Sequence, residues 1–206
     1  QGFLVEQPPS AVTNPHFHET DQFQVIVGGG GHFGKEPIQP LSIQYANAHT
    51  PYGPIVAGDD GITYFTLRSK WDPGAKYMPA SRENLIKGNQ RSKLIAGIKF
   101  DNERSRCTGV APIEEVIIPE EADHLAVWRL CIGPGQIMTS ADPTGSGGQY
   151  MIVLAGTMDC RGEELPRHSV LFVTKDEPAL RVHSGNDGLD LLVLQFPTPN
   201  RWTSTC

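Results

Sequence analysis

Residues 14–31, NPHFHETDQFQVIVGGGG, constrain the fold most strongly, because polar and apolar side chains alternate along them as in a β-strand. Successive side chains of a strand point to opposite faces, so His16, His18 and Gln22 share one face. Two imidazoles and an amide are unusual in a hydrophobic core, but imidazole is a good ligand for many metal ions. The opposite face, at positions 23, 25 and 27, is apolar. Another sheet, the second half of the chain or a second subunit must therefore cover it.

The composition predicts an all-β fold. The 206 residues include 22 Gly and 17 Pro, and clusters of Gly, Pro and Asp separate short apolar runs. A formal net charge of −6, with no basic stripe, argues against a nucleic-acid or anionic-membrane partner. No apolar run approaches the roughly 20 residues of a membrane-spanning helix. No secretory signal is recognisable, so we expect a cytoplasmic protein.

The four cysteines are scattered, without the spacing of a zinc site. Since a reducing cytoplasm keeps thiols reduced, we expect free buried thiols rather than two disulfides. The residues concerned are Cys107, Cys131, Cys160 and Cys206.

The two halves of the chain resemble one another. Residues 22–31 (QFQVIVGGGG) and 149–158 (QYMIVLAGTM) both begin with Gln and an aromatic residue and run through apolar residues into glycine. Gly-Asp turns precede a later strand in both halves, at 58–65 and 185–192. This similarity predicts an internal duplication. The expected parts are an N-terminal barrel with a metal site over 1–75, a partly helical connector over 76–122 and a C-terminal barrel over 123–206.

Further candidate residues follow from the same alternation. His49 ends the predicted strand IQYANAH and shares its face with Tyr45 and Asn47, so all three are expected to point into the site. Gln24 is the remaining amide on the inward face of the first strand. Arg68, at the end of ITYFTLR, is a candidate for binding a substrate carboxylate bidentately.

Two carboxylates and a glycine run are weaker candidates for a binding site. Glu19 and Asp21 are possible metal donors, but their odd-numbered positions place them on the face opposite to His16, His18 and Gln22. Asp21 would need a bulge in the strand to turn inward. Glycines 28–31 follow a strand, but no helix and no GK[ST] sequence comes after them. We therefore expect a tight turn there rather than a phosphate-binding loop.

The pattern around the two histidines resembles the cupin superfamily. The first cupin motif has the form G-x5-HxH-x3or4-E-x6-G, and the second contains a lone metal-binding histidine. His16 and His18 match the HxH, Gly29 falls at the closing glycine and His49 matches the second-motif histidine. Gln22 stands where a glutamate is usual. Ser10 replaces the opening glycine, and the PxG that should precede His49 is absent.

The resemblance implies cupin-type, jelly-roll-like β-barrels, and the repeat extends it to a bicupin. It covers residues 10–53 at the level of motifs. Aligning Gln149 with Gln22 puts Pro143 and Gly145 where the two motif histidines should be. The second half is therefore expected to be degenerate, serving as a scaffold or as the dimerisation half of a homodimer.

The resemblance also implies a metal and a chemistry. Without a glutamate, the centre would be three histidines, His16, His18 and His49, with Gln22 either coordinating or hydrogen-bonding nearby. Fe(II) is the first expectation, with Zn, Mn, Ni or Cu as alternatives. Cupin dioxygenases of the gentisate and diketone-cleaving kind resemble this arrangement, so a dioxygenase acting on a small anionic or aromatic substrate is expected. A non-catalytic small-molecule-binding bicupin and a metal-dependent isomerase or lyase are the alternatives.

Overall fold

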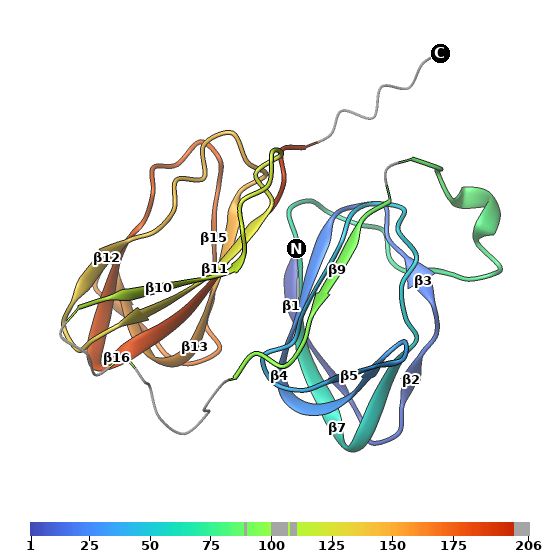
Figure 1. The fold of residues 1–206 in the computed structure, drawn as a ribbon, viewed down its shortest axis with the longest axis horizontal. Coiled ribbons are helices and arrows are strands. Elements are labelled where there is room, and N and C mark those ends of the chain that lie inside the picture. The colour runs from blue at the N-terminus through green and yellow to red at the C-terminus, as the bar shows by residue number, and fades with distance from the viewer. Residues whose placement is uncertain (89, 100–106, 108–110, 200–206) are drawn as a thin grey trace. The chain divides into compact units, whose positions relative to one another are not determined.

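The computed structural model describes residues 1–88, 90–99, 107 and 111–199. The chain divides into two compact units, residues 1–100 and 101–206, and each is described by itself. Nearly all regular structure is β-strand (Figure 1), which confirms the predicted all-β fold. The strands of the first unit are β1 (Gly2–Gln7), β2 (Val12–Thr13), β3 (His16–Phe17), β4 (Gln22–Phe33), β5 (Glu36–Ile38), β6 (Ile43–Ala46), β7 (Ile55–Arg68), β8 (Lys76–Tyr77) and β9 (Ser92–Ile95). Those of the second are β10 (Ile113–Ile118), β11 (Ala126–Ile132), β12 (Ile137–Thr139), β13 (Gln149–Cys160), β14 (Glu163–Leu165), β15 (Val170–Val173) and β16 (Arg181–Gln195).

Two long strands, β4 and β7, form the centre of the first unit. Its main sheet has the strand order β1-β7-β4-β6-β9, with β2 also paired to β7 and β5 to β4. Strands β3 and β8 form a separate two-stranded sheet. All these pairings are antiparallel. Antiparallel strands in this order place residues far apart in the sequence on one inner surface.

The second unit repeats this plan. Its sheet has the order β10-β11-β16-β13-β14, with β12 also paired to β16 and β15 to β13. The long strands β13 and β16 take the places of β4 and β7. Its core includes Trp128, Leu130, Met151 and Leu191, all buried.

The register of the long strands is the same in both units. Gln22 lies opposite Arg68 in the first unit, and Gln149 lies opposite Gln195 in the second. The residues of each pair are 46 positions apart in the chain. The second unit has Gln195 where the first has Arg68, and Nε2 of Gln149 donates to Oε1 of Gln195 at 2.8 Å.

The glycine run 28–31 continues β4 and does not form the tight turn that we expected. The register between β4 and β7 shifts between Ile26 and Gly28 and again between Gly29 and Gly31, which marks β-bulges. Gly29 has a φ of +65°, and a Cβ atom there would lie 2.1 Å from the carbonyl oxygen of Gly61. A glycine at this position therefore lets β4 and β7 approach each other at the bulge, where a side chain would collide with the backbone of the other strand.

The expected connector over 76–122 is not a separate, partly helical part. Strands β8 and β9 lie within the range of the first unit, and β10 lies within that of the second. Among the described residues the only helix is a single 3-10 turn, η1 (Arg82–Asn84). Leu94, whose spacing favoured a helix, lies in β9 opposite Gln44 of β6. Pairing with β6 satisfies the backbone of this segment, whereas Gly88 would weaken a helix.

The apolar face of β4 is buried, as its sequence required. Phe23 and Val25 are fully buried and Val27 is nearly so. Tyr45 of β6 lies opposite Phe23, and the two ring centroids are 5.0 Å apart. The other face of β4 carries Gln22 and Gln24, which are also buried. A strand buried on both faces with amides on one of them needs polar partners there.

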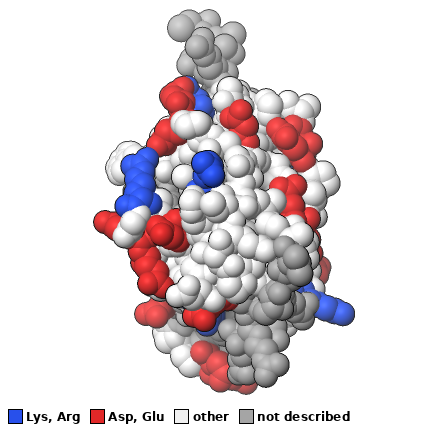
Figure 2. Space-filling model, turned by 90° about the vertical axis from the view of Figure 1, so that its left-hand side faces the viewer, with Lys and Arg blue, Asp and Glu red and all other residues white. Residues whose placement is uncertain are grey.

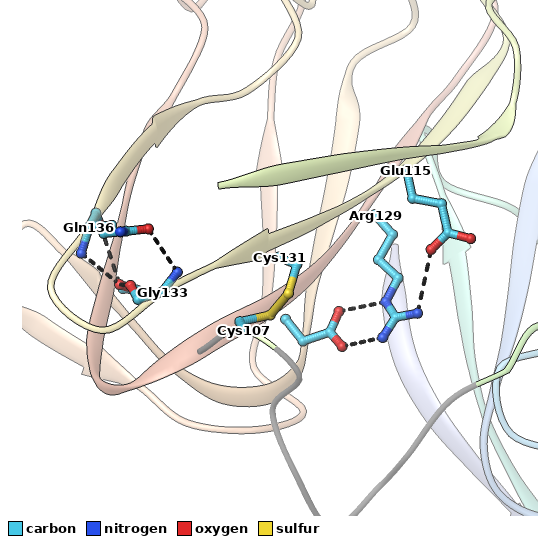
Figure 3. Close-up of a disulfide and its surroundings, with 8 residues drawn as sticks. Cys107, Glu115, Arg129, Cys131, Gly133 and Gln136 are labelled. Carbon is cyan, nitrogen blue, oxygen red and sulfur yellow. Dashed lines mark hydrogen bonds and ion pairs between the residues drawn. A yellow bond between two sulfur atoms is a disulfide. The ribbon is translucent and has the colours of Figure 1, made fainter. Parts of the chain in front are cut away.

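A disulfide joins Cys107 to Cys131 of β11, which corrects the expectation of free thiols (Figure 3). Close to it, Arg129 forms a bidentate ion pair with Asp190, at 2.8 and 2.6 Å, and lies 3.5 Å from Glu115. Disulfides persist in oxidising compartments, so this pairing does not favour the expected cytoplasmic location.

Cys160 is free, and Cys206 lies outside the described residues.

The charged side chains on the face drawn in Figure 2 are mainly acidic. Asp and Glu surround a largely uncharged centre, and the Lys and Arg side chains on it are few and scattered. Together with the net charge of −6, this face gives no support to binding of a polyanion. No helix in the described part of the chain is long and apolar enough to cross a membrane.

Candidate functional site

The candidate site of the first unit is a buried polar cluster at one end of β4 and β7. It brings together His16 of β3, His18 just after it, Gln22 at the start of β4 and Arg68 at the end of β7. All four side chains are buried, at 1–6% exposure. Antiparallel pairing of β4 with β7 places Gln22 directly opposite Arg68, so the sheet register itself assembles the pair.

Asp72 holds the ring of His18. Its Oδ1 atom lies 2.7 Å from Nδ1 of His18, and the same carboxylate accepts the backbone N–H groups of Glu19 at 2.9 Å and Gly74 at 2.8 Å. Burial alone would raise the pKa of Asp72, but the hydrogen bonds from His18, Gly74 and Glu19 outweigh it and lower this pKa. The group is therefore a carboxylate that accepts the Nδ1 proton of His18.

His16 is held in the same way by a backbone carbonyl. Its Nδ1 lies 2.8 Å from the carbonyl oxygen of Asn14, which can only accept a hydrogen bond. Burial lowers the pKa of His16, and the neighbouring His18 and Arg68 lower it further, so the ring is neutral at neutral pH. In both histidines the proton is thus on Nδ1, and the lone pair is on Nε2. The ring centroids are 5.2 Å apart.

Arg68 links the amide to the histidines. Its Nε donates to Oε1 of Gln22 at 3.1 Å, and its Nη2 lies 3.0 Å from Nε2 of His18. Its Nη1 lies 4.0 Å from Asp72. The Gln22 amide nitrogen in turn donates to the hydroxyl of Tyr52, whose ring centroid is 4.5 Å from that of His16. Burial raises the pKa of Tyr52, which keeps the phenol protonated.

Three predicted site residues are not brought to this cluster. Tyr45 lies on the other face of the sheet against Phe23, and the Arg91 guanidinium lies over its ring at 5.4 Å. Asn47 accepts the backbone N–H of Arg91 at 2.8 Å. The alternation we assumed along IQYANAH ends with β6 at Ala46, so Asn47 and His49 do not continue it.

The backbone of His49 lies next to the backbone of His18. Its backbone N–H donates to the carbonyl of His18 at 2.7 Å, while its ring centroid lies 5.5 Å from that of Phe17. Phe17 lies between His16 and His18 in the sequence, so its side chain points to the opposite side of the chain from theirs. His49 has a φ of +57° in the turn that follows β6.

The two weaker carboxylate candidates have other partners. Glu19 is exposed and lies 3.6 Å from the Lys76 amine. Asp21 accepts the backbone N–H of Ala48 at 2.8 Å, and burial raises its pKa. Neither carboxylate is therefore a member of the His16–His18 cluster.

Reasoning from the sequence missed Asp72 and Tyr52. Asp72 lies in the sequence SKWDPG, four residues after Arg68. An Asp before Pro-Gly is typical of a turn, so the sequence offered no reason to place it in a site. Tyr52 precedes Gly53 in a stretch rich in Gly and Pro, where an aromatic side chain in a loop is the ordinary expectation. Both are buried, and polar groups are buried only with partners. The only signal for Asp72 was its four-residue spacing from Arg68.

The two imidazoles fit a divalent metal ion in ligand type and in tautomer. Metal-bound histidines commonly donate their second N–H to a carboxylate or a backbone carbonyl, as His18 and His16 do. Over residues 1–88, 90–99, 107 and 111–199, no group of three or more His, Cys, Asp or Glu side chains is arranged to hold a metal ion. The Nη2 atom of Arg68 lies 3.0 Å from Nε2 and 3.2 Å from Nδ1 of His18, so a cation is already close to the nitrogen that a metal would bind.

Comparisons with solved structures identify the fold. A proposed dioxygenase from Nostoc punctiforme PCC 73102 matches with a TM-score of 0.68 and 14% identity, over 98% of this chain and 71% of that one. Oxalate decarboxylase from Bacillus subtilis matches with a TM-score of 0.61 and 10% identity, over 95% and 67%. Salicylate 1,2-dioxygenase from Pseudaminobacter salicylatoxidans matches with a TM-score of 0.56 and 10% identity, over 94% and 70%.

Two comparisons made with the sequence found no match. No protein-family model matches it, and no curated protein matches it either. The three structural neighbours are cupin-fold proteins, and each is matched over nearly the whole of this chain. The protein therefore has the cupin fold.

Proposed function

We propose that the first unit is the catalytic half of a metal-dependent bicupin enzyme, and that its reaction is that of a non-haem Fe(II) dioxygenase on a small anionic substrate. One observation carries the proposal: His16 and His18 both have Nδ1 occupied by an oxygen acceptor, so both present the Nε2 lone pair within one buried cluster. The dioxygenases among the structural neighbours support the same class of reaction.

Each residue of the cluster has a role in this proposal. His16 and His18 hold the metal, and Asp72 orients His18. Gln22, whose amide already bonds Arg68 and Tyr52, is a neutral hydrogen-bonding group at the site rather than a charged ligand. A bound Fe(II) would supply open coordination positions and the redox chemistry between a substrate and O2. The proposed third ligand is His49, whose ring would have to turn toward the pair.

Arg68 is proposed to bind the carboxylate of the substrate. Its Nη2 atom lies close to both ring nitrogens of His18 in this structure, and a metal cation bound to Nε2 would be repelled by it. Metal binding therefore requires the guanidinium to move off His18, and a substrate carboxylate would stabilise it in its new position. This predicts that metal and an anionic ligand bind cooperatively.

Metal content tests the proposal directly. Protein purified without a chelator or a nickel column is analysed for iron, manganese, nickel, copper and zinc, beside His16→Ala, His18→Ala and His49→Ala. We expect about one metal ion per chain in the wild type and its loss in the first two variants. Loss in His49→Ala as well would establish the three-histidine centre. No metal in the wild type after reconstitution with each ion would overturn the enzyme proposal.

Oxygen uptake then tests the reaction. Catechols, hydroxybenzoates and diketones are screened with the metal-loaded protein, and Arg68→Met is the matched variant. We expect turnover only with an anionic substrate, and a higher KM in Arg68→Met. Metal binding without turnover of any of these classes would leave an isomerase or lyase reaction.

The position of Arg68 favours a second candidate, a non-catalytic bicupin that binds a small anion. In this alternative Arg68 and the His18–Asp72 pair form the binding site, without a metal. Calorimetric binding of a small carboxylate by metal-free protein, with no effect of added metal on its affinity, would support it.

The role of the second unit and the assembly belong to the same proposal. We propose that the second unit, with Gln149 and Gln195 at the equivalent positions, is a scaffold, and that the protein is a homodimer. Sedimentation equilibrium measures the assembly. A monomer at all concentrations would contradict it.

A further inference from the structure

One edge of β15 is open in the described part of the second unit. The corresponding strand of the first unit is β6, because residues 43–46 pair with the start of β4 in the same register in which residues 170–173 pair with the start of β13. On its other side β6 pairs with β9. Within the described residues, β15 pairs with β13 alone, and no strand of the second unit corresponds to β9.

The backbone of β15 offers hydrogen bonds at this edge. The carbonyl oxygen of Ser169 accepts the N–H of Val153 in β13 at 3.0 Å. Alternate residues of an antiparallel strand direct their N–H and C=O groups to the same side, so those of Val170 and Phe172 point away from β13. Such an edge is a template for another strand. The sequence of β15, VLFV, has no proline and no charge, which are the usual means of blocking an edge.

The side chain of Phe172 is less covered than its counterpart in the first unit. Phe172 of β15 corresponds to Tyr45 of β6. Tyr45 is fully buried, with Lys93 of β9 opposite it and the Arg91 guanidinium over its ring at 5.4 Å. Phe172 is 38% exposed. The first unit therefore shows what covers this position, namely a strand paired with the open edge.

A groove of about 760 Å³ runs along the open edge of β15. Its lining includes Leu165 of β14 and Leu171 of β15. The equivalent positions of the first unit, Ile38 and Gln44, line a cavity of only about 10 Å³, which Leu94 of β9 helps to close. The groove therefore has the position and the apolar lining for a strand that places one apolar side chain where Leu94 lies in the first unit.

The charges on the groove favour a second copy of this chain over a charged peptide. The groove carries two arginines and two glutamates, Arg161, Arg181, Glu163 and Glu177. Equal numbers of the two signs select neither an acidic nor a basic partner, and a two-fold axis can bring arginines of one copy to glutamates of the other. A two-fold axis perpendicular to a strand also pairs that strand with its own copy in the antiparallel sense, as β9 pairs with β6.

We propose that β15 of two copies pair with each other about a two-fold axis at Leu171, so that the second units of a dimer share one continuous sheet. The partner's Leu171 then lies where Leu94 lies in the first unit. Val170 and Phe172 form the hydrogen-bonded pairs with the partner's Phe172 and the partner's Val170, and an aromatic side chain packs well against a β-branched one across strands. This interface rests on the homodimer proposed above.

Sedimentation equilibrium of the full chain tests the interface. The proteins are the wild type, Phe172→Lys and the control Ile137→Lys, which changes an exposed apolar side chain of β12. We expect the wild type and Ile137→Lys to dimerise alike. The dimer dissociation constant of Phe172→Lys should rise at least tenfold, because the variant loses the aromatic contact and brings two lysines near one axis. A monomeric wild type, or equal dimerisation of Phe172→Lys, would overturn the interface.

A disulfide across the axis is a second test, which does not depend on the loss of a contact. Residues of a non-hydrogen-bonded pair have Cα atoms about 4.5 Å apart, a separation that a disulfide bridges. Leu171→Cys is made with Cys160→Ser and Cys206→Ser, and Ile137→Cys in the same background is the control. We expect oxidation to give a covalent dimer linked at position 171 in the first protein alone. No link at 171, or equal linking at 137, would overturn the interface.

These outcomes are separable from the proposed enzyme. The metal content of Phe172→Lys should equal that of the wild type, because the proposed centre lies in the first unit. A monomeric wild type that holds metal would contradict the interface and the proposed dimer but not the metal centre. A dimer that Phe172→Lys leaves intact would contradict the interface alone.

Discussion

Oδ1 of Asp72 lies 2.7 Å from Nδ1 of His18, although the two residues are 54 positions apart in the chain. The contact fixes the tautomer and the orientation of the His18 ring, because a carboxylate can only accept the Nδ1 proton. The same carboxylate also accepts two backbone N–H groups, so it is held in place itself. The Nε2 lone pair of His18 is thereby directed into the candidate site.

Removal of this carboxylate should weaken metal binding. An amide at position 72 would orient His18 less firmly and would not stabilise charge on the ring, so the metal affinity of Asp72→Asn should fall about 10- to 100-fold. Competition with a chromophoric chelator measures the affinity. The control is Asp59→Asn, an exposed acid on β7. Equal affinities of Asp72→Asn and the wild type would show that His18 does not bind the metal.

The stability of the second unit should depend on pH through His168. Burial lowers the pKa of its ring from the ordinary value of 6.5, and Arg167 lowers it further. As the pH falls, the unfolded state therefore takes up this proton before the folded state does, so stability should fall as the pH drops from 7.5 through 6.5. In His168→Asn this fall should be shallower. Asparagine also suits the φ of +69° at this position.

Urea unfolding at pH 7.5, 6.5 and 5.5 measures this dependence. His32→Asn, which changes an exposed histidine, is the matched control. A pH dependence that is the same in His168→Asn and the wild type would show that the His168 ring does not contribute.

The Cys107–Cys131 disulfide should stabilise the second unit substantially. It closes a loop of 24 residues, and the loss of chain entropy in the unfolded state corresponds to about 3 kcal/mol. Reduction, or the double change Cys107→Ser and Cys131→Ser, should lower the unfolding free energy by about that amount. Peptide mapping without reductant should recover the linked pair. Cys160→Ser is the control, and its stability should stay near that of the wild type.

Gly29 should be far less tolerant of substitution than its neighbour Gly28. Gly29 has a φ of +65°, and an added Cβ would lie 2.1 Å from the Gly61 carbonyl oxygen. Gly29→Ala should therefore cost about 2 kcal/mol or more. At Gly28 the nearest atom is 3.5 Å away, an ordinary contact, so Gly28→Ala should be mild.

The second unit offers an independent test of the same geometry. Gly156 has a φ of +71° and a Cβ there would lie 2.0 Å from the Gly188 carbonyl oxygen, so Gly156→Ala should resemble Gly29→Ala. Urea unfolding measures all three variants. A mild effect of Gly29→Ala would show that β4 and β7 do not cross this closely.

Strand periodicity predicted the parts of the site that depend on local alternation. His16, His18 and Gln22 do lie together, although not on one strand as the alternation assumed: His16 is in β3, Gln22 begins β4, and residues 18–21 between them are not strand. Arg68 joins them because the start of β4 pairs with the end of β7. The same reasoning failed for Tyr45 and Asn47, since β6 ends at Ala46 and Tyr45 faces the apolar layer with Phe23.

The sequence by itself determined the all-β fold, the repeated strand pattern and the polar face of β4, because these depend on residues within one strand. Only the tertiary structure decided which groups complete that face. Asp72, Tyr52 and Gln44 reach it from turns and strands that lie 20 to 54 residues away from their partners His18, Gln22 and Gln24. Contacts over such separations follow from strand register and chain reversal, which no local pattern of residues encodes.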